Sequence, residues 1–325
     1  MAKNAGKTVA FNTILKEATE KKIRTGLVSY GRDGEETDIL NRHEKPRIFI
    51  PPETIFVTTS NAYEKSGLNV ELIFNTSIKT TLGQVGIYKT SDTGGNVELV
   101  GINSISGLKK IKDYIEKNVE LLMVDGALDR KSSAIPEITQ GIILATGSVL
   151  GNTEELVIKR TIFEIEKINL SEIKDEAVKK IIFENNNLNT GFLLGNNEIH
   201  YFKSLTSFNV IDELERFKIP GDSIIYLRGA LTDSFCEKLC YGLKAKNLTI
   251  VLRDSTQIFL NQRNFNLLRN NNFKIFVLKK IKLLAITVNP ISPYGVRLDS
   301  DKIISGLKKN LDIPVYDLLS SSYSF

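Results

Sequence analysis

Short apolar segments that end in glycine or aspartate alternate with stretches of helical periodicity along this chain. The segments "IRTGLVSYG" (23–31), "VELLMVDGALDR" (119–130) and "GIILATGSVLG" (141–151) have the length and apolar content of buried strands. Apolar residues recur at helical spacing over 7–22 and 152–168. This alternation predicts an α/β fold with a parallel sheet, in which functional groups gather at the carboxyl ends of the strands.

The segment from about 45 to 102 has a different pattern. Its short β-rich runs, among them "ETIFVTT" and "VELIFNT", are separated by proline, glycine, asparagine and aspartate, as in "SDTGGN". Such signals favour hairpins. We therefore expect a β-rich, antiparallel insertion into the sheet, or an extension of it.

A second α/β series follows after about residue 170. Strand-like runs at 223–230, 248–254 and 273–290 are separated by helical segments. A chain of 325 residues is long enough for two domains. We predict one α/β domain over 1–168, which contains the β-rich insertion, and a second over 169–325.

The composition argues against several classes of protein. Lys and Arg number 43 against 38 Asp and Glu, and the net charge of +5 is spread along the chain, so we expect no nucleic-acid partner. No apolar run reaches the roughly 18 residues of a membrane span, and the first residues do not resemble a signal peptide. We expect a cytoplasmic protein without a membrane partner. Cys236 and Cys240 are expected to pack in a core, and His43 and His200 are too few for a metal cluster or a Ser-His-Asp triad.

The stretch "NAGKT" at residues 4–8 resembles the second half of a phosphate-binding loop. In such a loop, backbone N–H groups at a helix N-terminus cradle a di- or triphosphate. Lys7 would reach the β- and γ-phosphates and Thr8 would hold Mg²⁺, with Gly6 in the turn. The full pattern G-x-x-x-x-G-K-[ST] places a glycine where this chain has Met1, and a buried strand normally precedes the loop.

Two aspartates complete the constellation that Mg-ATP requires. Asp125 ends the apolar run "ELLMVD", as does the metal-linked carboxylate of many nucleotide hydrolases, and Asp33 lies in "GRDGEE" after the preceding strand. We predict Asp125 and Asp33 as catalytic residues, and Thr8 and Asp125 as metal ligands. Each acid also has an ordinary explanation, because strands end in polar loops and Asp-Gly pairs form turns.

Further candidates follow the later strands. Asn289 in "TVNP" is predicted as a base-contacting, cofactor-binding residue, although a proline-terminated strand explains it equally well. The backbone of Gly147 and Ser148 is a candidate to contact a ligand. The alternative is that these residues form a tight turn between a strand and a helix. Asp129 and Arg130 are either a phosphate-sensing switch or a solvent-exposed pair.

Together the segments "AKNAGKTVAFN", "SYGRDGEETD", "VDGALDRKSSA", "ILATGSVL" and "ITVNPISPYG" resemble the P-loop subunit of the lysine 5,6-aminomutase reactivase of anaerobic bacteria. The resemblance runs from about residue 2 to the end of the chain. It implies a P-loop NTPase-like sheet and an ATP-dependent chaperone that helps an adenosylcobalamin enzyme exchange inactivated cofactor. The implied partners are lysine 5,6-aminomutase and a MutS-like ATPase subunit, and the implied ligands are ATP and Mg²⁺.

The resemblance carries Lys7 and Thr8 over as nucleotide and Mg²⁺ ligands and Asp125 as a metal-linked acid. A relative is expected to have a strand before "AKNAGKT", so we expect that this chain starts inside its own P-loop, at an internal start codon, with Lys7 and Thr8 retained. Two alternatives stay open. One is a P-loop small-molecule kinase or ATP-dependent ligase, and the other is a binding subunit with a vestigial nucleotide site.

Overall fold

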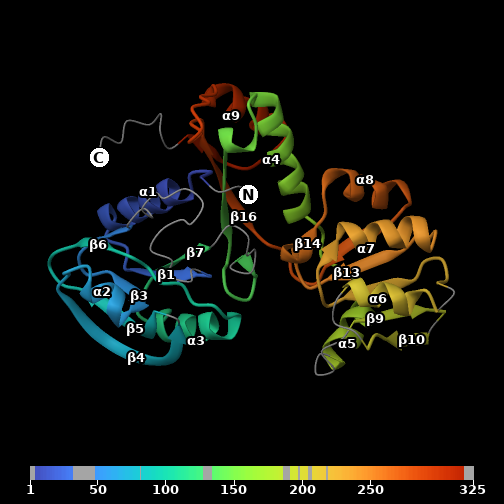
Figure 1. Ribbon diagram of the computed structural model, residues 1–325, viewed down its shortest axis with the longest axis horizontal. Helices are drawn as coiled ribbons and strands as arrows, with labels where there is room; N and C mark the ends of the chain where they lie inside the picture. The colour runs from blue at the N-terminus through green and yellow to red at the C-terminus, as the bar shows by residue number, and fades with distance from the viewer. Residues whose placement is uncertain are drawn as a thin grey trace. The chain divides into compact units, whose positions relative to one another are not determined.

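The computed structural model describes residues 4–31, 48–80, 82–126, 134–185, 191–196, 198–203, 207–216 and 219–317 (Figure 1). It is a mixed α/β protein whose larger sheets contain parallel strand pairs. Within these ranges no helix combines the length and the apolar content that a membrane crossing requires. Contacts divide the chain into two units, one up to Arg160 and from Leu284 onward, the other Thr161–Leu283.

The first unit contains one five-stranded sheet and two smaller sheets. Its elements are α1 (Lys7–Glu20), β1 (Thr25–Tyr30), β2 (Ile48–Ile50), β3 (Ile55–Thr59), α2 (Ser60–Glu64), β4 (Val70–Thr80), β5 (Gly83–Thr90), β6 (Gly95–Val97), α3 (Ile105–Ile115), β7 (Leu121–Gly126), β8 (Ile142–Gly147), β16 (Leu283–Asn289), α9 (Ser300–Lys308) and β17 (Val315–Asp317). Helix α4 (Glu154–Ile168) begins in this unit, and the division between the units falls within it, after Arg160.

The larger sheet of this unit has the strand order β4-β5-β3-β1-β7. β1 pairs in parallel with β3 and β7, whereas β5 pairs antiparallel with β3 and β4. The β-rich region therefore extends the sheet through an antiparallel edge, as the turn signals in the sequence predicted. β2 and β6 form a separate antiparallel pair, and a third sheet has the order β17-β16-β8.

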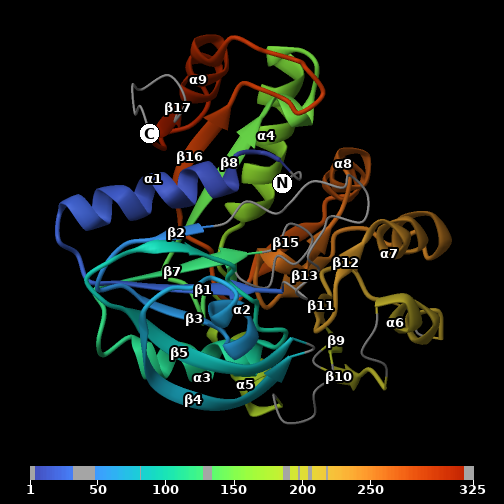
Figure 2. The same cartoon turned by 60° about the vertical axis from the view of Figure 1, so that its left-hand side comes forward.

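Side-chain alternation along β1 explains how this sheet is covered. Leu27 packs in the cluster that contains Phe11 of α1, and the next residue, Val28, packs in the cluster that contains Leu108 of α3. Successive residues of a strand point to opposite faces, so α1 and α3 cover the two faces of the sheet. Both views show these helices on opposite sides of β1 and β3 (Figure 2).

The second unit has a sheet of order β10-β9-β11-β13-β15. β9 and β10 form an antiparallel hairpin, while β11, β13 and β15 are parallel. Its elements are α5 (Glu176–Glu184), β9 (Phe192–Gly195), β10 (Glu198–Tyr201), α6 (Ser207–Leu214), β11 (Ile224–Leu227), β12 (Leu231–Thr232), α7 (Asp233–Glu237) with a π-helical turn at Lys238–Gly242, β13 (Thr249–Leu252), β14 (Ile258–Phe259), α8 (Gln262–Asn270) and β15 (Lys274–Val277).

The faces of this second sheet also follow from alternation. Ile250 packs in the cluster formed with α6, α7 and α8, and the neighbouring Val251 packs in the cluster that contains Val178 of α5. Cys236 and Cys240 are buried and belong to the former cluster, in agreement with their predicted packing role.

The boundaries of the two units differ from those of the expected domains, 1–168 and 169–325. The apolar run 273–290 forms two strands, β15 and β16, which belong to different sheets. The lysine-containing segment between them ends β15: the backbone N–H of Lys280 donates to Oε1 of Glu172 at 2.8 Å instead of to a strand. Residues from Leu284 onward consequently group with the N-terminal unit.

Candidate functional site

Helix α1 begins at a turn of unusual backbone conformation. Asn4 and Gly6 both have positive φ, 64° and 93°, so the chain enters the helix through left-handed positions. Gly6 is the N-cap and supplies no side-chain acceptor, and the first turn, which is wholly described, contains no acidic residue. The first N–H groups of α1 therefore have no capping side chain of their own, unlike those of α3 or α9, which Ser104 and Asp299 cap.

Asn289, at the carboxyl end of β16, holds this turn. Its Nδ2 donates to the carbonyl oxygen of Asn4 at 3.3 Å, and its Oδ1 accepts from the N–H of Ile291 at 3.1 Å. A Cβ on Gly6 would lie 3.0 Å from the Cβ of Asn289. Glycine is thus favoured at residue 6 both by its φ and by the close approach of β16.

Asn289 was predicted as a base-contacting residue. Its amide is engaged on both sides with the backbone, which gives it a positioning role between β16 and the start of α1. A contact with a nucleotide base stays a prediction.

The end of β8 reaches the same place. Gly147 has φ 156°, and a Cβ there would lie 1.9 Å from the carbonyl oxygen of Asn289. The carboxyl ends of β8 and β16 and the N-terminus of α1 therefore meet at Asn289. This distance explains why residue 147 is glycine, and backbone approach of Gly147 to a ligand stays a prediction.

Several buried hydroxyl groups accompany this junction. Within the described residues, Oγ of Ser148 and Oγ1 of Thr287 have no hydrogen-bond partner, although the two residues are only 5 % and 6 % exposed. Buried polar atoms normally have a hydrogen-bond partner, so each of these two hydroxyl groups indicates a place for a ligand, an ion or a water molecule. Both residues flank the Gly147–Asn289 contact in sequence.

Lys7 and Thr8 lie in the first turn of α1, and both are partly buried. Asp125 is the penultimate residue of β7, partly buried, in register beside Ser29 of β1. α1 connects to β1 through residues 21–24 and packs on the same sheet, so it runs back along the parallel strands. Its N-terminus and Asp125 thus lie toward the same, carboxyl end of β1 and β7.

The metal part of the prediction has less support. Among the described residues there is no group of three or more His, Cys, Asp or Glu side chains placed to hold a metal ion. Mg²⁺ in nucleotide sites takes only one or two protein ligands and completes its shell with phosphate oxygens and water, so Thr8 and Asp125 fit that role by type. Their ligation of Mg²⁺ stays a prediction. Asp33, Asp129 and Arg130 lie outside the described residues.

The sequence prediction did not include the buried hydroxyl groups of Ser29 and Thr287. Both sit inside apolar strand runs, "GLVSYG" and "AITVNP", and Ser29 is 0 % exposed with an Oγ that has no partner in the described ranges. A polar residue within such a run is the signal that would have identified them. No family model, curated protein or solved structure matches this chain.

Proposed function

We propose that the first unit binds a nucleotide through its phosphates at the N-terminus of α1, and that the chain acts as an ATP-dependent reactivating chaperone. The observation that carries the proposal is the junction of Gly6, Gly147 and Asn289. There α1, a helix of 14 residues, begins beside the carboxyl ends of β8 and β16, and its N-cap residue provides no capping side chain.

The physical reason is that the N-terminus of α1 combines hydrogen-bond donors with a positive electrostatic potential. The N–H groups of a first helical turn have no partner within the helix, and the helix dipole contributes about half a positive charge there. Lys7 adds a full positive charge within the same turn. A phosphate group would accept hydrogen bonds from these N–H groups and offset the charge, as at other phosphate-binding helix termini.

Magnesium would enter with the nucleotide. Thr8 supplies a hydroxyl group one residue beyond Lys7, and Asp125 supplies a carboxylate toward the same end of the sheet. With Mg²⁺ bound, the metal would neutralise phosphate charge and orient the γ-phosphoryl group. Asp33 and Asp125 are the two acids that we propose take part in catalysis.

The identity of the protein partners rests on the sequence motifs alone. The resemblance of "AKNAGKTVAFN" and "VDGALDRKSSA" to the aminomutase reactivase supports a cytoplasmic chaperone whose partners are lysine 5,6-aminomutase and a MutS-like ATPase. ATP would bias a two-state interaction with the aminomutase, and the chaperone would then favour release of damaged cobalamin.

Calorimetric titration of the chain with Mg-ATP tests the nucleotide site. We expect saturable binding that Lys7→Ala weakens by at least about tenfold, equivalent to ~1.4 kcal/mol. Lys16→Ala is the matched control, because Lys16 is an exposed lysine of the same helix. Equal affinity in the wild type and in Lys7→Ala would overturn the proposed site.

A second assay separates the chaperone from the alternative of a small-molecule kinase or ligase. ATP hydrolysis is measured with the aminomutase and the second subunit present, and separately with a panel of metabolites. Stimulation by the proteins supports the chaperone, whereas turnover that requires a metabolite supports the enzyme. ATP binding without turnover in either mixture would favour the vestigial site.

A further inference from the structure

Two arginines occupy equivalent positions at the ends of adjacent parallel strands in the second unit. Leu227, the last residue of β11, is in register with Leu252, the last residue of β13. Arg228 and Arg253 follow them directly, so both arginines lie just beyond the carboxyl ends of neighbouring strands.

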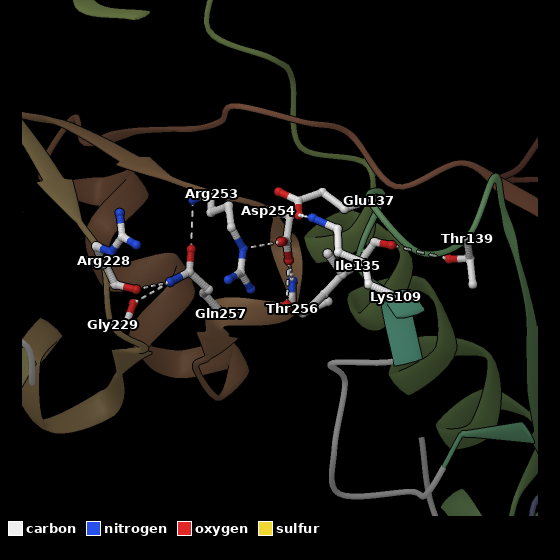
Figure 3. Close-up of polar contacts among 10 residues, drawn as sticks. All are labelled: Lys109, Ile135, Glu137, Thr139, Arg228, Gly229, Arg253, Asp254, Thr256 and Gln257. Atoms are coloured by element: carbon white, nitrogen blue, oxygen red, sulfur yellow. Dashed lines mark hydrogen bonds and ion pairs between the residues drawn. The ribbon is translucent and has the colours of Figure 1, made fainter. Parts of the chain in front are cut away.

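A buried glutamine fixes the two loops that carry these arginines. Gln257 is 7 % exposed, and its Nε2 donates to the carbonyl oxygens of Arg228 and Gly229, the latter at 2.9 Å. Its Oε1 accepts from the backbone N–H of Arg253 at 2.7 Å (Figure 3). Two of these contacts tie the Gln257 loop to the loop that carries Arg228, and the third holds Arg253 within its own loop, so the two arginine backbones are fixed in advance of any ligand.

A fully buried carboxylate orients the second arginine. Asp254 is 0 % exposed and accepts hydrogen bonds from the N–H and Oγ1 of Thr256 and, at 2.8 Å, from Nε of Arg253 (Figure 3). This contact uses only Nε. The side chain of Arg253 is 40 % exposed, and its terminal Nη groups have no hydrogen bond to a protein atom within the described ranges.

Tyr226, two residues before Arg228 on β11, responds to the charges of both arginines. Burial raises the pKa of its phenol, whereas the charges of Arg228 and Arg253 act in the opposite direction, and Arg228 also donates a hydrogen bond to the phenol oxygen. The phenol of Tyr226 is therefore within the electrostatic influence of both arginines. Ser255, in the same loop as Asp254, is 4 % exposed, and its Oγ has no partner among the described residues.

We propose that Arg228, Arg253 and the Ser255–Gln257 turn form a second binding site, in the second unit, for the phosphate group of a small molecule. Two guanidinium groups and one carboxylate leave a net charge of about +1, which an oxyanion would neutralise. One guanidinium fork satisfies both oxygens of a carboxylate, whereas a phosphate has enough oxygens to accept hydrogen bonds from two guanidinium groups.

This site is separate from the one proposed at α1, and the two hypotheses stand independently. Nothing in the sequence prediction assigned a role to the residues concerned. The signal for them is a repeat of the pattern Leu-Arg after an apolar strand, in "IIYLRG" and "TIVLRD".

Calorimetric titration with inorganic phosphate tests the proposal on the full chain. Lys7→Ala is included as a background variant, so that phosphate bound at α1 is removed from the signal. In that background we expect saturable binding, weakened at least tenfold by Arg253→Gln and by Arg228→Gln. Arg269→Gln is the matched control, because Arg269 belongs to the same unit and pairs only loosely, at 3.8 Å, with Glu166.

Glycerol 3-phosphate and acetate distinguish the kinds of ligand. Binding of the ester at least as tight as that of inorganic phosphate supports a site for a phosphorylated metabolite. Acetate binding as tight as phosphate would overturn the phosphate assignment. If Arg253→Gln unfolds, as its link to a buried carboxylate allows, Arg228→Gln and Ser255→Ala decide the question. No saturable phosphate binding in Lys7→Ala, or unchanged affinity in these variants, overturns the site.

Discussion

At the residue scale, the contact between Gly147 and Asn289 is the most restrictive feature of the first unit. It joins a glycine at the end of β8 to a residue that also bonds Asn4, 285 positions away in the chain. The spacing of residues within a short segment of the sequence cannot predict a contact between residues so far apart in the chain. The sequence therefore identified Gly6, Gly147 and Asn289 separately, and their meeting became visible only in three dimensions.

Gly147→Ala tests this contact. The added methyl group would lie 1.9 Å from the carbonyl oxygen of Asn289, so the backbone of β8 or β16 must move. We expect a loss of about 3 kcal/mol in the free energy of unfolding, at the upper end of what overpacking costs. Urea denaturation followed by circular dichroism provides the measurement.

Gly221→Ala is the control for this substitution, since nothing lies within 4 Å of a Cβ at that position and its φ is not positive. We expect a change of less than about 0.5 kcal/mol there. If the two alanine variants unfold at the same urea concentration, the close approach of β8 to β16 is wrong.

At the element scale, the helices differ in how their N-termini are capped. α5, α8 and α9 each begin at a side chain that accepts hydrogen bonds from the first turn, namely Asp175, Asn261 and Asp299. α1 begins at Gly6 without one. Replacing such a cap by alanine costs about 1 kcal/mol but by glycine only about a few tenths of a kcal/mol, so glycine is a tolerated N-cap for α1 although it leaves the first turn without a side-chain acceptor.

The N-terminus of α9 has a second carboxylate whose effect depends on pH. Glu154, at the start of α4, accepts from the N–H of Asp299 at 3.1 Å, and this hydrogen bond lowers the pKa of Glu154 below its usual 4.5. Because the folded state holds the carboxylate form, the contribution to stability is complete above pH 4.5 and is lost as the pH falls through the lowered pKa.

Glu154→Gln is therefore expected to lower the urea midpoint at pH 7, and the difference from the wild type is expected to shrink as the pH falls below 4.5. Glu155→Gln, an exposed neighbour in the same first turn, serves as the control. A difference between Glu154→Gln and the wild type that grew on acidification would contradict the assigned hydrogen bond.

Most elements were predictable from the sequence, and the exceptions have physical reasons. β1, β8 and α4 follow the expected runs closely, because their apolar patterns are strong. α5 was not predicted, although Asp175 and the pair Val178 and Ile182 carry the signals of a cap and of a buried helical face. The split of 273–290 into β15 and β16 depends on which sheet each half joins, which periodicity does not encode.

At the scale of the whole molecule, the two units have separate hydrophobic cores. The cluster around Ile250 contains only residues between Phe163 and Val277, and the cluster around Val28 contains only residues up to Ile138. Local unfolding can therefore expose the core of one unit while the core of the other unit stays folded.

Ile250→Ala tests this separation. Ile250 is 0 % exposed, and truncation of such a residue costs about 3 kcal/mol. We expect faster amide hydrogen exchange in β9, β11, β13 and β15, with unchanged exchange in β1 and β3. Leu27→Ala, which truncates a residue of 0 % exposure in the first unit, should produce the reverse pattern. Uniformly faster exchange in both units would show that the cores open together.

The central claim is that α1 receives a phosphate at its first turn. Its most direct test is an amide-resolved ¹H–¹⁵N titration of the deuterated chain with Mg-ATP, repeated with Lys7→Ala. The account predicts saturable shifts of the Gly6, Lys7 and Thr8 amides, with smaller shifts at Gly147 and Asn289, and their loss in the variant. Unchanged amide signals in the first turn of α1 at saturating Mg-ATP would contradict it.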